Sequence, residues 1–430
     1  MTQPIAASPA RRLKGLWLAR EFPHPLDTGD RIYTAQLIRA VREAGCDLTL
    51  AAIPQDGVDR MPDEWGVNCV PVPGGRTPSW RALLSAMPMV AATHATPAYR
   101  SVVQRLAMQD WDFVVIDQYG MGWAIPFFTQ PAGQAGPAGQ ARKPVLVHVA
   151  HDHEASVCRS LAHGFRGNPL KKLALRLNAV KAGTLERRIA RQVDLLTAIT
   201  DEDAALFRQD APGTASVVLT PGYDGTIFDS RTIDEHVPRR VIMVGSYKWM
   251  AKEENLRQFV NEADPAFAKA GIELHVIGSM NEGMKEHIRT QCKATVVHGF
   301  VDDLEPHMRA ARIAAVPEAI GGGFKLKFLD YIFSRVPVAT IAHAAAGLPG
   351  HVRGSMIQSE DMASLVRDII GHIDQVEQLD ARQAQALEAA AALYRWSDRG
   401  VALRDAIVAR MRQAPREVKA LPARVGATSS

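Results

Sequence analysis

Short apolar runs alternate with amphipathic stretches along most of the chain. In the first half, runs with the length of buried strands lie at residues 13–19, 48–53, 111–117, 144–150, 193–200 and 216–220. In the second half, such runs lie at residues 241–244, 272–278, 294–298, 313–317 and 337–341. Residues with helical periodicity separate most of them. Strands that alternate with helices in this way predict an α/β protein with two successive parallel, doubly wound sheets.

The same pattern divides the chain into parts. We expect an N-terminal Rossmann-like domain at 1–223, a linker at 224–238, a C-terminal Rossmann-like domain at 239–393, a helix at 394–412 that crosses back to the N-terminal domain, and a disordered tail at 413–430. The linker is placed where the sequence is polar and ends in Pro238. Residues 130–144 are low in complexity and predict a flexible surface loop.

Composition narrows the class of protein. The 430 residues contain four widely spaced cysteines, which argues against a disulfide framework or a cysteine zinc site and favours a reducing compartment. Neither a signal sequence nor a run of about 20 apolar residues is found, so a cytoplasmic protein is expected. Nucleotide-binding motifs of dinucleotide dehydrogenases and P-loop NTPases are absent from the sequence. The net charge of +4 is small, and no nucleic-acid partner is expected.

The charge is concentrated in one segment, residues 166–191. Eight basic residues and a single acid, Glu186, alternate there with leucine, isoleucine and valine, which predicts one basic amphipathic helix. One interpretation is contact with an anionic membrane surface, which would place the protein at the inner face of the membrane, or with an acidic acceptor. The other interpretation is a packed helix whose basic face is solvated.

The stretch Gly321–Asp330 carries the strongest candidate chemistry. Three glycines between an expected strand and a helix let backbone N–H groups approach an anion, and Lys325 and Lys327 add positive charge. Asp330 falls on the helix face opposite the apolar residues, where it can accept hydrogen bonds from ligand hydroxyls. The stretch predicts a site for a nucleotide-diphosphate sugar. The alternative is a glycine turn next to an exposed ion pair.

Two N-terminal segments follow expected strands and are site candidates because ligands of doubly wound sheets bind beyond the carboxyl ends of strands. In the loop 21–31, Gly29 would allow close approach to a ligand and Arg31 would reach an anion; alternatively, Thr28 or Asp30 only caps the next helix.

The second segment is His151-Asp152-His153-Glu154, directly after the expected strand 144–150. A role in the site is favoured for His151. A metal site is not, because no third ligand follows at helical spacing. The alternative is that Asp152 is only a helix N-cap.

Several segments, taken in their order along the chain, resemble those of the GT-B glycosyltransferases of the retaining family 4 type. They are residues 25–31, 151–155, 221–224, 245–249, 303–304, 316–317, 321–331 and 336–339. The resemblance implies two Rossmann-like domains that face a central cleft. It further implies transfer of a hexose, with retention, from a nucleotide-diphosphate sugar to a glycan, lipid-linked or small-molecule acceptor.

The resemblance also implies roles for individual residues. Catalytic roles fall to His151, Lys325 and Lys327, donor binding to Gly29, Gly245, Lys248, Lys252, Gly322, Gly323, Phe324 and Asp330, and acceptor contacts to Asp30, Arg31 and Glu154. Neither a metal nor a cofactor is expected, because the lysines and the glycine-loop N–H groups would stabilise the leaving diphosphate.

The sequence departs from the family at two positions. Gly322 stands where most members have a glutamate that contacts the donor sugar, and Ser246 stands where they have an arginine for the diphosphate. These departures keep open the alternative of a nucleotide-sugar-binding subunit without catalytic activity. A second alternative is another class of enzyme on the same architecture, a nucleotide-sugar epimerase of GT-B shape.

Overall fold

The computed structural model describes residues 11–55, 57–129, 143–165, 167–320 and 323–413. Gly322, nearly all of the expected tail and most of the loop predicted at 130–144 lie outside the described residues. Two parallel sheets form, as predicted, one of seven strands in the order β3-β2-β1-β4-β5-β6-β7 and one of six in the order β10-β9-β8-β11-β12-β13. Apolar clusters pack on both faces of each sheet.

The strands follow the predicted apolar runs closely. The first sheet contains β1 (Leu13–Glu21), β2 (Cys46–Ile53), β3 (Asn68–Pro71), β4 (Phe113–Asp117), β5 (Val145–Val149), β6 (Leu195–Ala198) and β7 (Ala215–Val218). The second contains β8 (Arg240–Val244), β9 (Glu273–Ile277), β10 (Thr295–Gly299), β11 (Ile313–Val316), β12 (Val338–Ile341) and β13 (Ile357–Ser359). The edge strands β3 and β13 were not predicted, because they are short and partly exposed and so lack a long apolar run.

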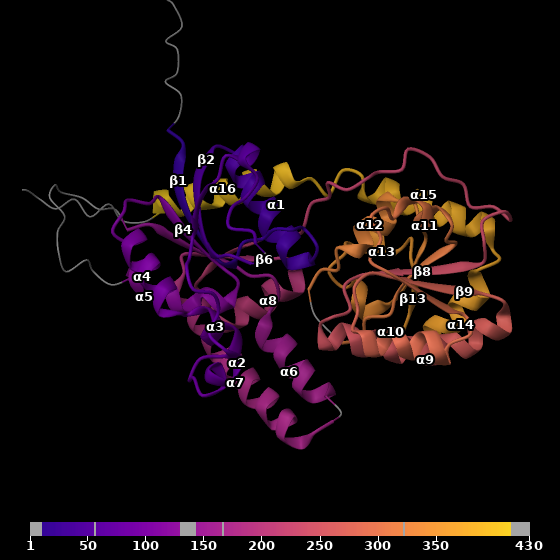
Figure 1. The fold of residues 1–430 in the computed structure, drawn as a ribbon. Helices are drawn as coiled ribbons and strands as arrows, with labels where there is room; N and C mark the ends of the chain where they lie inside the picture. Colours follow the sequence, from indigo (N-terminus) through magenta and orange to yellow (C-terminus); the bar gives the residue numbers. More distant parts are fainter. Residues whose placement is uncertain (1–10, 56, 130–142, 166, 321–322, 414–430) are drawn as a thin grey trace, which may run out of the picture.

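Helices cover both faces of each sheet (Figure 1). Those of the first half are α1 (Gly29–Glu43), α2 (Ser79–Leu83), α3 (Met89–His94), α4 (Pro97–Leu106), α5 (Pro126–Thr129), α6 (Glu154–Gly164), α7 (Pro169–Gln192) and α8 (Asp201–Asp210). Those of the second half are α9 (Met250–Ala270), α10 (Glu282–Gln291), α11 (Glu305–Arg309), α12 (Lys327–Phe333), α13 (Gly350–Arg353), α14 (Met362–His372), α15 (Val376–Ala390) and α16 (Trp396–Gln413). Short 3₁₀ helices lie at Asp63–Trp65, Tyr119–Ala124 and Ala342–Ala345.

The last helix, α16, lies against the N-terminal domain (Figure 1). Trp396, Leu403 and Ile407 are buried in the core of that domain. A Cβ atom on Gly400 would lie 2.1 Å from the carbonyl oxygen of Ala40 in α1, so only glycine allows the two helices to pack this closely. The helix α16, which follows the C-terminal domain in the chain, therefore fastens that domain to the N-terminal one.

The helices α6 and α7 form a hairpin that projects from the N-terminal domain (Figure 1). The helix α7 begins where the side chain of Asn168 accepts hydrogen bonds from the N–H groups of Leu170 and Lys171. Its second half is packed, with Ile189 fully buried, whereas four apolar residues of its first half are exposed: Leu170, Leu173, Leu177 and Val180. None of the described helices combines the length and the apolar character that crossing a membrane requires.

Candidate active site

Three lysines surround one buried carboxylate at the carboxyl edge of the second sheet. Glu318 follows β11 and is 6% exposed, and its Oε1 atom lies 2.6 Å from Nζ of Lys327. Burial alone would raise the pKa of Glu318, but the charges of Lys327, Lys325 and Lys252 outweigh it and lower this pKa to about 2. Burial and the two neighbouring lysines lower the pKa of Lys252. The cluster has an excess of positive charge suited to an anion.

Backbone contacts hold the segment around this cluster in place. The side chain of Asn255, in α9, donates a hydrogen bond to the carbonyl of Ile320 (2.7 Å) and accepts one from its N–H (3.0 Å). Lys325 Nζ donates to the carbonyl of Gly323 at 3.0 Å. A Cβ atom on Gly245 would lie 3.2 Å from Nζ of Lys327, so the glycine after β8 leaves space for this ammonium group. The cluster is therefore built from three separate segments of the C-terminal domain.

The glycine loop also touches the N-terminal domain. Gly323 has φ +66°, and a Cβ atom there would lie only 1.9 Å from Oδ1 of Asp152. A Cβ atom on Gly29 would lie 3.5 Å from Leu326. Burial raises the pKa of Asp152 to about 6, and the charge of Lys325 opposes the shift. The segments around Gly29 and Asp152 in the N-terminal domain thus meet the segment 323–326 of the C-terminal domain at one interface.

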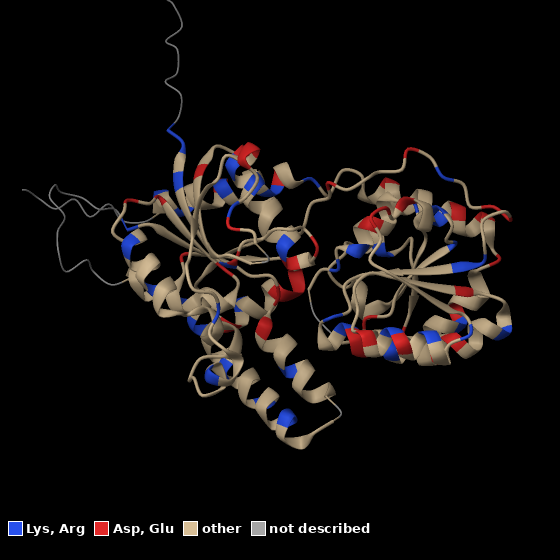
Figure 2. Ribbon diagram, in the orientation of Figure 1, with Lys and Arg blue, Asp and Glu red and all other residues tan. Residues whose placement is uncertain are grey.

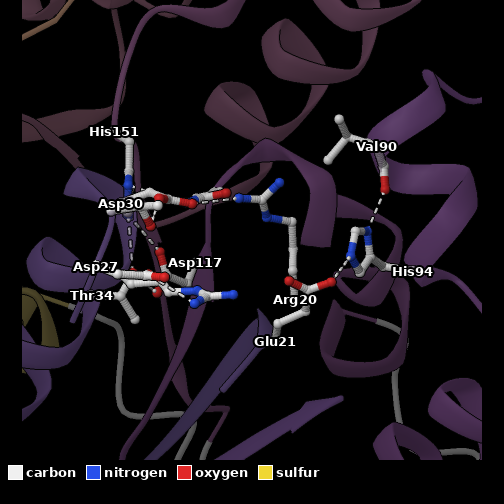
Figure 3. Close-up of polar contacts among 12 residues, drawn as sticks. Arg20, Glu21, Asp27, Asp30, Thr34, Val90, His94, Asp117 and His151 are labelled. Atoms are coloured by element: carbon white, nitrogen blue, oxygen red, sulfur yellow. Dashed lines mark hydrogen bonds and ion pairs between the residues drawn. The ribbon is translucent and has the colours of Figure 1, made fainter. Parts of the chain in front are cut away.

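His151 belongs to a buried hydrogen-bond network at the carboxyl ends of β4 and β5 (Figure 3). Its Nε2 atom lies 3.0 Å from Oδ1 of Asp117, whose Oδ2 atom accepts hydrogen bonds from Thr34 (2.8 Å) and Trp17 (2.9 Å). The amide of Gln118 lies 3.1 Å from Nδ1, and Gln118 has φ +61°, a strained conformation for a residue with a side chain. The network fixes the imidazole ring.

A small polar pocket opens next to this network. Its lining includes Arg20, Glu21, Asp30, Arg31, Thr34, Asp117 and Gln118. Arg20 Nη2 lies 3.2 Å from Oδ2 of Asp30 (Figure 3), and Arg31 pairs with Asp27 at 2.8 Å. Burial opposes ionisation of Asp30, but the charge of Arg20, the hydrogen bond from Thr28 and weaker contributions from His151 and Arg31 together outweigh it and lower the pKa of Asp30. The pocket therefore presents charged groups of both signs.

The first turns of α1 and α6 are not capped by the side chains that the sequence suggested as alternatives. Thr28 precedes α1, but its hydroxyl donates to the carboxylate of Asp30 at 2.6 Å and makes no cap to the helix backbone. The residue that precedes α6 is His153, so Asp152 is not its N-cap. Instead, the buried carboxylate of Glu186 accepts the N–H groups of Glu154 and Ala155, each at 2.8 Å. Glu186 thus does the work of an N-cap from the neighbouring helix α7.

The two histidines of this segment have different partners. The ring of His153 contacts Ser156 (2.7 Å) and Asp210 (3.3 Å), whereas the ring of His151 contacts Asp117 and Gln118. Burial, reinforced by the charges of Asp152 and Glu186, raises the pKa of Glu154 to about 8. Acidic residues gather where α6 and α8 begin, on the side of the C-terminal domain (Figure 2).

The other residues predicted to bind the donor differ in how deeply they are buried. Asp330, in α12, is half-buried; burial raises its pKa to about 6, with Lys327 opposing the shift. Phe324 is half-buried, and its ring lies 6.0 Å from that of Tyr394, so it contributes packing. Lys248 is exposed. Gly322 lies outside the described residues.

Glu318, Asp117 and Gln118 belong to this site and were not predicted from the sequence. Asp117 is the last residue of β4, and Glu318 follows β11 after Pro317. Both lie at or just beyond the carboxyl end of a strand, the position that makes His151 a site candidate. The same criterion, applied to every predicted strand, identifies Asp117 and Glu318 as candidates too.

Comparisons with known proteins agree with the fold of two parallel-sheet domains. Residues 28–222 match the glycosyl transferase 4-like domain, and residues 238–375 match the glycosyl transferases group 1. Sucrose-phosphate synthase from Thermosynechococcus elongatus has a similar structure, with a TM-score of 0.68 at 14% identity, over 94% of this chain and 100% of that chain. None of the curated proteins matches the chain.

Two further solved structures are similar over most of their length. One is WaaG, a glycosyltransferase involved in lipopolysaccharide biosynthesis, with a TM-score of 0.61 at 16% identity, over 90% of this chain and 99% of that chain. The other is HepE from Anabaena in complex with UDP and glucose, with a TM-score of 0.60 at 14% identity, over 92% of this chain and 100% of that chain. All three share the two-domain arrangement of parallel sheets.

Proposed function

The chain belongs to the group 1 glycosyltransferases and has their GT-B fold, and we propose that it transfers a hexose, with retention, from a nucleotide-diphosphate sugar to a hydroxyl acceptor. The observation that carries this proposal is the lysine cluster around Glu318, next to a glycine loop that meets the N-terminal domain. Membership of this family favours transfer over the epimerase and the non-catalytic subunit. A strict requirement for an acceptor would separate transfer from epimerisation.

We infer that Lys252, Lys325 and Lys327 bind the diphosphate of the donor. Their charges already converge on one anion, the carboxylate of Glu318. A diphosphate next to them would share or replace this partner. Asp330 would accept hydrogen bonds from the ribose hydroxyls. HepE has been solved with UDP-glucose, so UDP-glucose is the first donor to test.

The proposed chemistry follows from where charge develops. The bond between the anomeric carbon and the phosphate oxygen breaks, the acceptor oxygen bonds to the same face of that carbon, and the acceptor proton passes to the leaving phosphate. The lysines stabilise the negative charge of the leaving group, so neither a divalent cation nor a cofactor is required. His151, held by Asp117 and Gln118, would position the donor sugar.

The acceptor is proposed to enter from the N-terminal domain. Asp30 and Arg31 line the polar pocket next to the His151 network and can bind acceptor hydroxyls. Glu154 lies at the start of α6, beside a groove of about 390 Å³ between α6 and α7. This groove is lined by small apolar residues and by Arg159, Arg176 and Arg187. Apolar walls with arginines favour an acceptor that has both an apolar part and an anionic group.

We further propose that the first half of α7 rests on an anionic membrane surface. Leu170, Leu173, Leu177 and Val180 are 76%, 54%, 55% and 69% exposed and share one helix face. Basic residues flank this stripe, and the hairpin that carries it projects from the domain (Figure 1). Such a contact would bring a lipid-linked acceptor to the groove between α6 and α7.

A transfer assay tests the proposal. The full chain is incubated with UDP-glucose and a lipid extract, and release of UDP and labelling of product are measured. We expect Lys325→Ala with Lys327→Ala to lower turnover by at least about 10²-fold, as for the loss of other preorganised charges. Lys269→Ala, an exposed lysine of α9, is the matched control. Near-normal turnover in the double variant would overturn the assignment, and inhibition by chelators would overturn metal independence.

A further inference from the structure

Three histidines that no part of the proposed reaction uses lie together in the C-terminal domain. His275 is in β9, His298 in the neighbouring edge strand β10, and His307 in α11. One ring nitrogen from each lies within 4.8 Å of the other two. The rings of His298 and His307 are 4.7 Å apart between centroids. Imidazole nitrogens that converge in this way are the ligands that zinc and related ions prefer.

The contact between the rings of His275 and His298 limits which of their nitrogens can carry a proton. His298 Nε2 and His275 Nδ1 are 3.0 Å apart, so a proton on one of them must be donated to the other. Glu273 Oε2 lies 3.3 Å from the other ring nitrogen of His275, Nε2, and holds the proton there. The Nδ1 lone pair of His275 therefore points at His298. A metal ion can replace the single proton between the two rings.

Glu273 supplies a carboxylate next to a histidine ligand, an arrangement that recurs in metal sites. A carboxylate that accepts the second ring N–H of a histidine ligand fixes the tautomer and increases the basicity of the ligand. Arg240, which pairs with Glu273 at 2.7 Å, is the nearby charge that opposes a cation, and the carboxylate offsets it.

The cluster shares no residue with the proposed donor site. His275 is in the middle of β9 and its partner Glu273 is the first residue of that strand, whereas the proposed donor site lies beyond the carboxyl ends of β8 and β11. His298 is the last but one residue of the edge strand β10. It therefore calls for an explanation of its own. A ligand there would join the edge strand β10 to the short helix α11.

We propose that His275, His298 and His307 bind one divalent zinc ion, with water in the fourth position. Tetrahedral zinc with bonds of about 2.1 Å brings its nitrogen ligands to about 3.4 Å from one another. The pair His275–His298 is 3.0 Å apart, close to this distance, and the nitrogen of the partly exposed His307 lies within 4.8 Å of both. The ion would fasten α11 to the edge of the sheet.

Metal binding to the full chain, with any affinity tag removed and after dialysis against a chelator, tests this site. Zinc chloride is titrated by calorimetry, and cobalt chloride is titrated with visible absorption to detect tetrahedral coordination. We expect one zinc ion per chain with a dissociation constant in the micromolar range or below. His298→Ala and His307→Ala should each weaken binding at least tenfold, and Glu273→Gln by about 10–100-fold.

His287→Ala, an exposed histidine of α10 in the same domain, is the matched control and should bind zinc like the wild type. Each variant is first checked for a cooperative unfolding transition, and His307→Ala remains informative if a more buried variant fails to fold. The proposal is wrong if zinc does not bind, or if His298→Ala and His307→Ala bind it as tightly as His287→Ala.

Discussion

The ammonium nitrogen of Lys327 lies 2.6 Å from the Oε1 atom of Glu318, and both side chains are largely buried. Lys325 and Lys252 act on the same carboxylate. In the free enzyme the carboxylate of Glu318 compensates the positive charge of the three lysines. In the complex the donor diphosphate would compensate the same charge. The pair therefore connects the stability of the free enzyme to its affinity for the donor.

Glu318→Gln should separate these two effects. Removing one partner of a buried ion pair costs about 3–5 kcal/mol, because the remaining charge is left uncompensated. We expect a lower melting temperature for the ligand-free variant and a larger rise on addition of UDP-glucose than in the wild type, since the diphosphate restores the missing charge. Thermal unfolding with and without UDP-glucose measures both.

The control for this experiment is Glu262→Gln, an exposed glutamate of α9. It should change neither quantity appreciably. An identical ligand-induced rise in the wild type and in Glu318→Gln would mean that the diphosphate does not engage the lysines that Glu318 holds.

Much of this site could be predicted because its parts are local in the sequence. Lys325, Lys327 and the glycines lie within a few residues of one another, and the strand before them identifies the edge of the sheet that they face. His151 was selected for the same reason. These residues stay predictions as donor and catalytic groups, although the glycine loop and the segment of His151 do meet in the structure.

Other features depend on contacts between distant segments, and no local pattern reports them. His275, His298 and His307 converge only because β9 and β10 are neighbours and α11 folds back beside them. The cap of α6 comes from Glu186 in α7, so the residue types at the helix start gave the wrong N-cap. Helical periodicity predicts the apolar face of α7, but it cannot show that only the second half of that face packs against the rest of the domain.

Asp330 predicts the pH dependence of donor binding. Burial raises its pKa to about 6, with Lys327 opposing and Asp224 reinforcing the shift. Because the proposed contact with ribose hydroxyls uses the ionised form, affinity for UDP-glucose should fall as the pH drops below 6, approaching tenfold per pH unit. For folding the sign is opposite: the raised pKa stabilises the protein at low pH, and this contribution is lost as the pH rises through 6.

Binding of UDP-glucose measured between pH 5 and pH 8 checks this prediction. UDP-glucose is preferred to UDP because its two phosphates are diesters without a protonation step in that range. Asp330→Asn should bind more weakly at pH 7.5 and show a flatter profile. Asp152, whose pKa burial also raises to about 6, is compared through Asp152→Asn, and an unchanged slope in Asp330→Asn would refute the assignment.

Gly323→Ala tests the contact between the domains. The left-handed φ of +66° costs alanine about 1–2 kcal/mol, and the new Cβ atom would lie 1.9 Å from Oδ1 of Asp152. We expect a lower melting temperature and a lower kcat/KM for UDP-glucose. Gly283→Ala, where a Cβ atom meets nothing within 4 Å, is the control.

A double-mutant cycle makes this test specific to the contact. If Gly323 touches Asp152 in solution, Asp152→Ala should relieve part of the clash, so that the two changes are not additive. Additive effects on stability would mean that the glycine loop and the N-terminal domain are apart in the free enzyme.

The exposed stripe of α7 gives a prediction about membranes. If this helix rests on an anionic surface, the full chain should sediment with vesicles that contain phosphatidylglycerol and less with vesicles of phosphatidylcholine alone. Each basic residue near such a surface contributes about 1 kcal/mol. Lys171→Gln with Lys172→Gln should therefore weaken binding about 30-fold, and Leu173→Ser with Leu177→Ser should weaken it for both lipids.

The two pairs of substitutions separate attraction from insertion. Raising the salt concentration should reproduce the effect of the lysine substitutions and leave that of the leucine substitutions, since only the first is screened. Lys269→Gln, outside the hairpin, is the control for net charge. Binding that is equal for both lipids, or unaffected by either pair, would mean that the exposed leucines serve another contact and that the acceptor reaches the groove between α6 and α7 from solution.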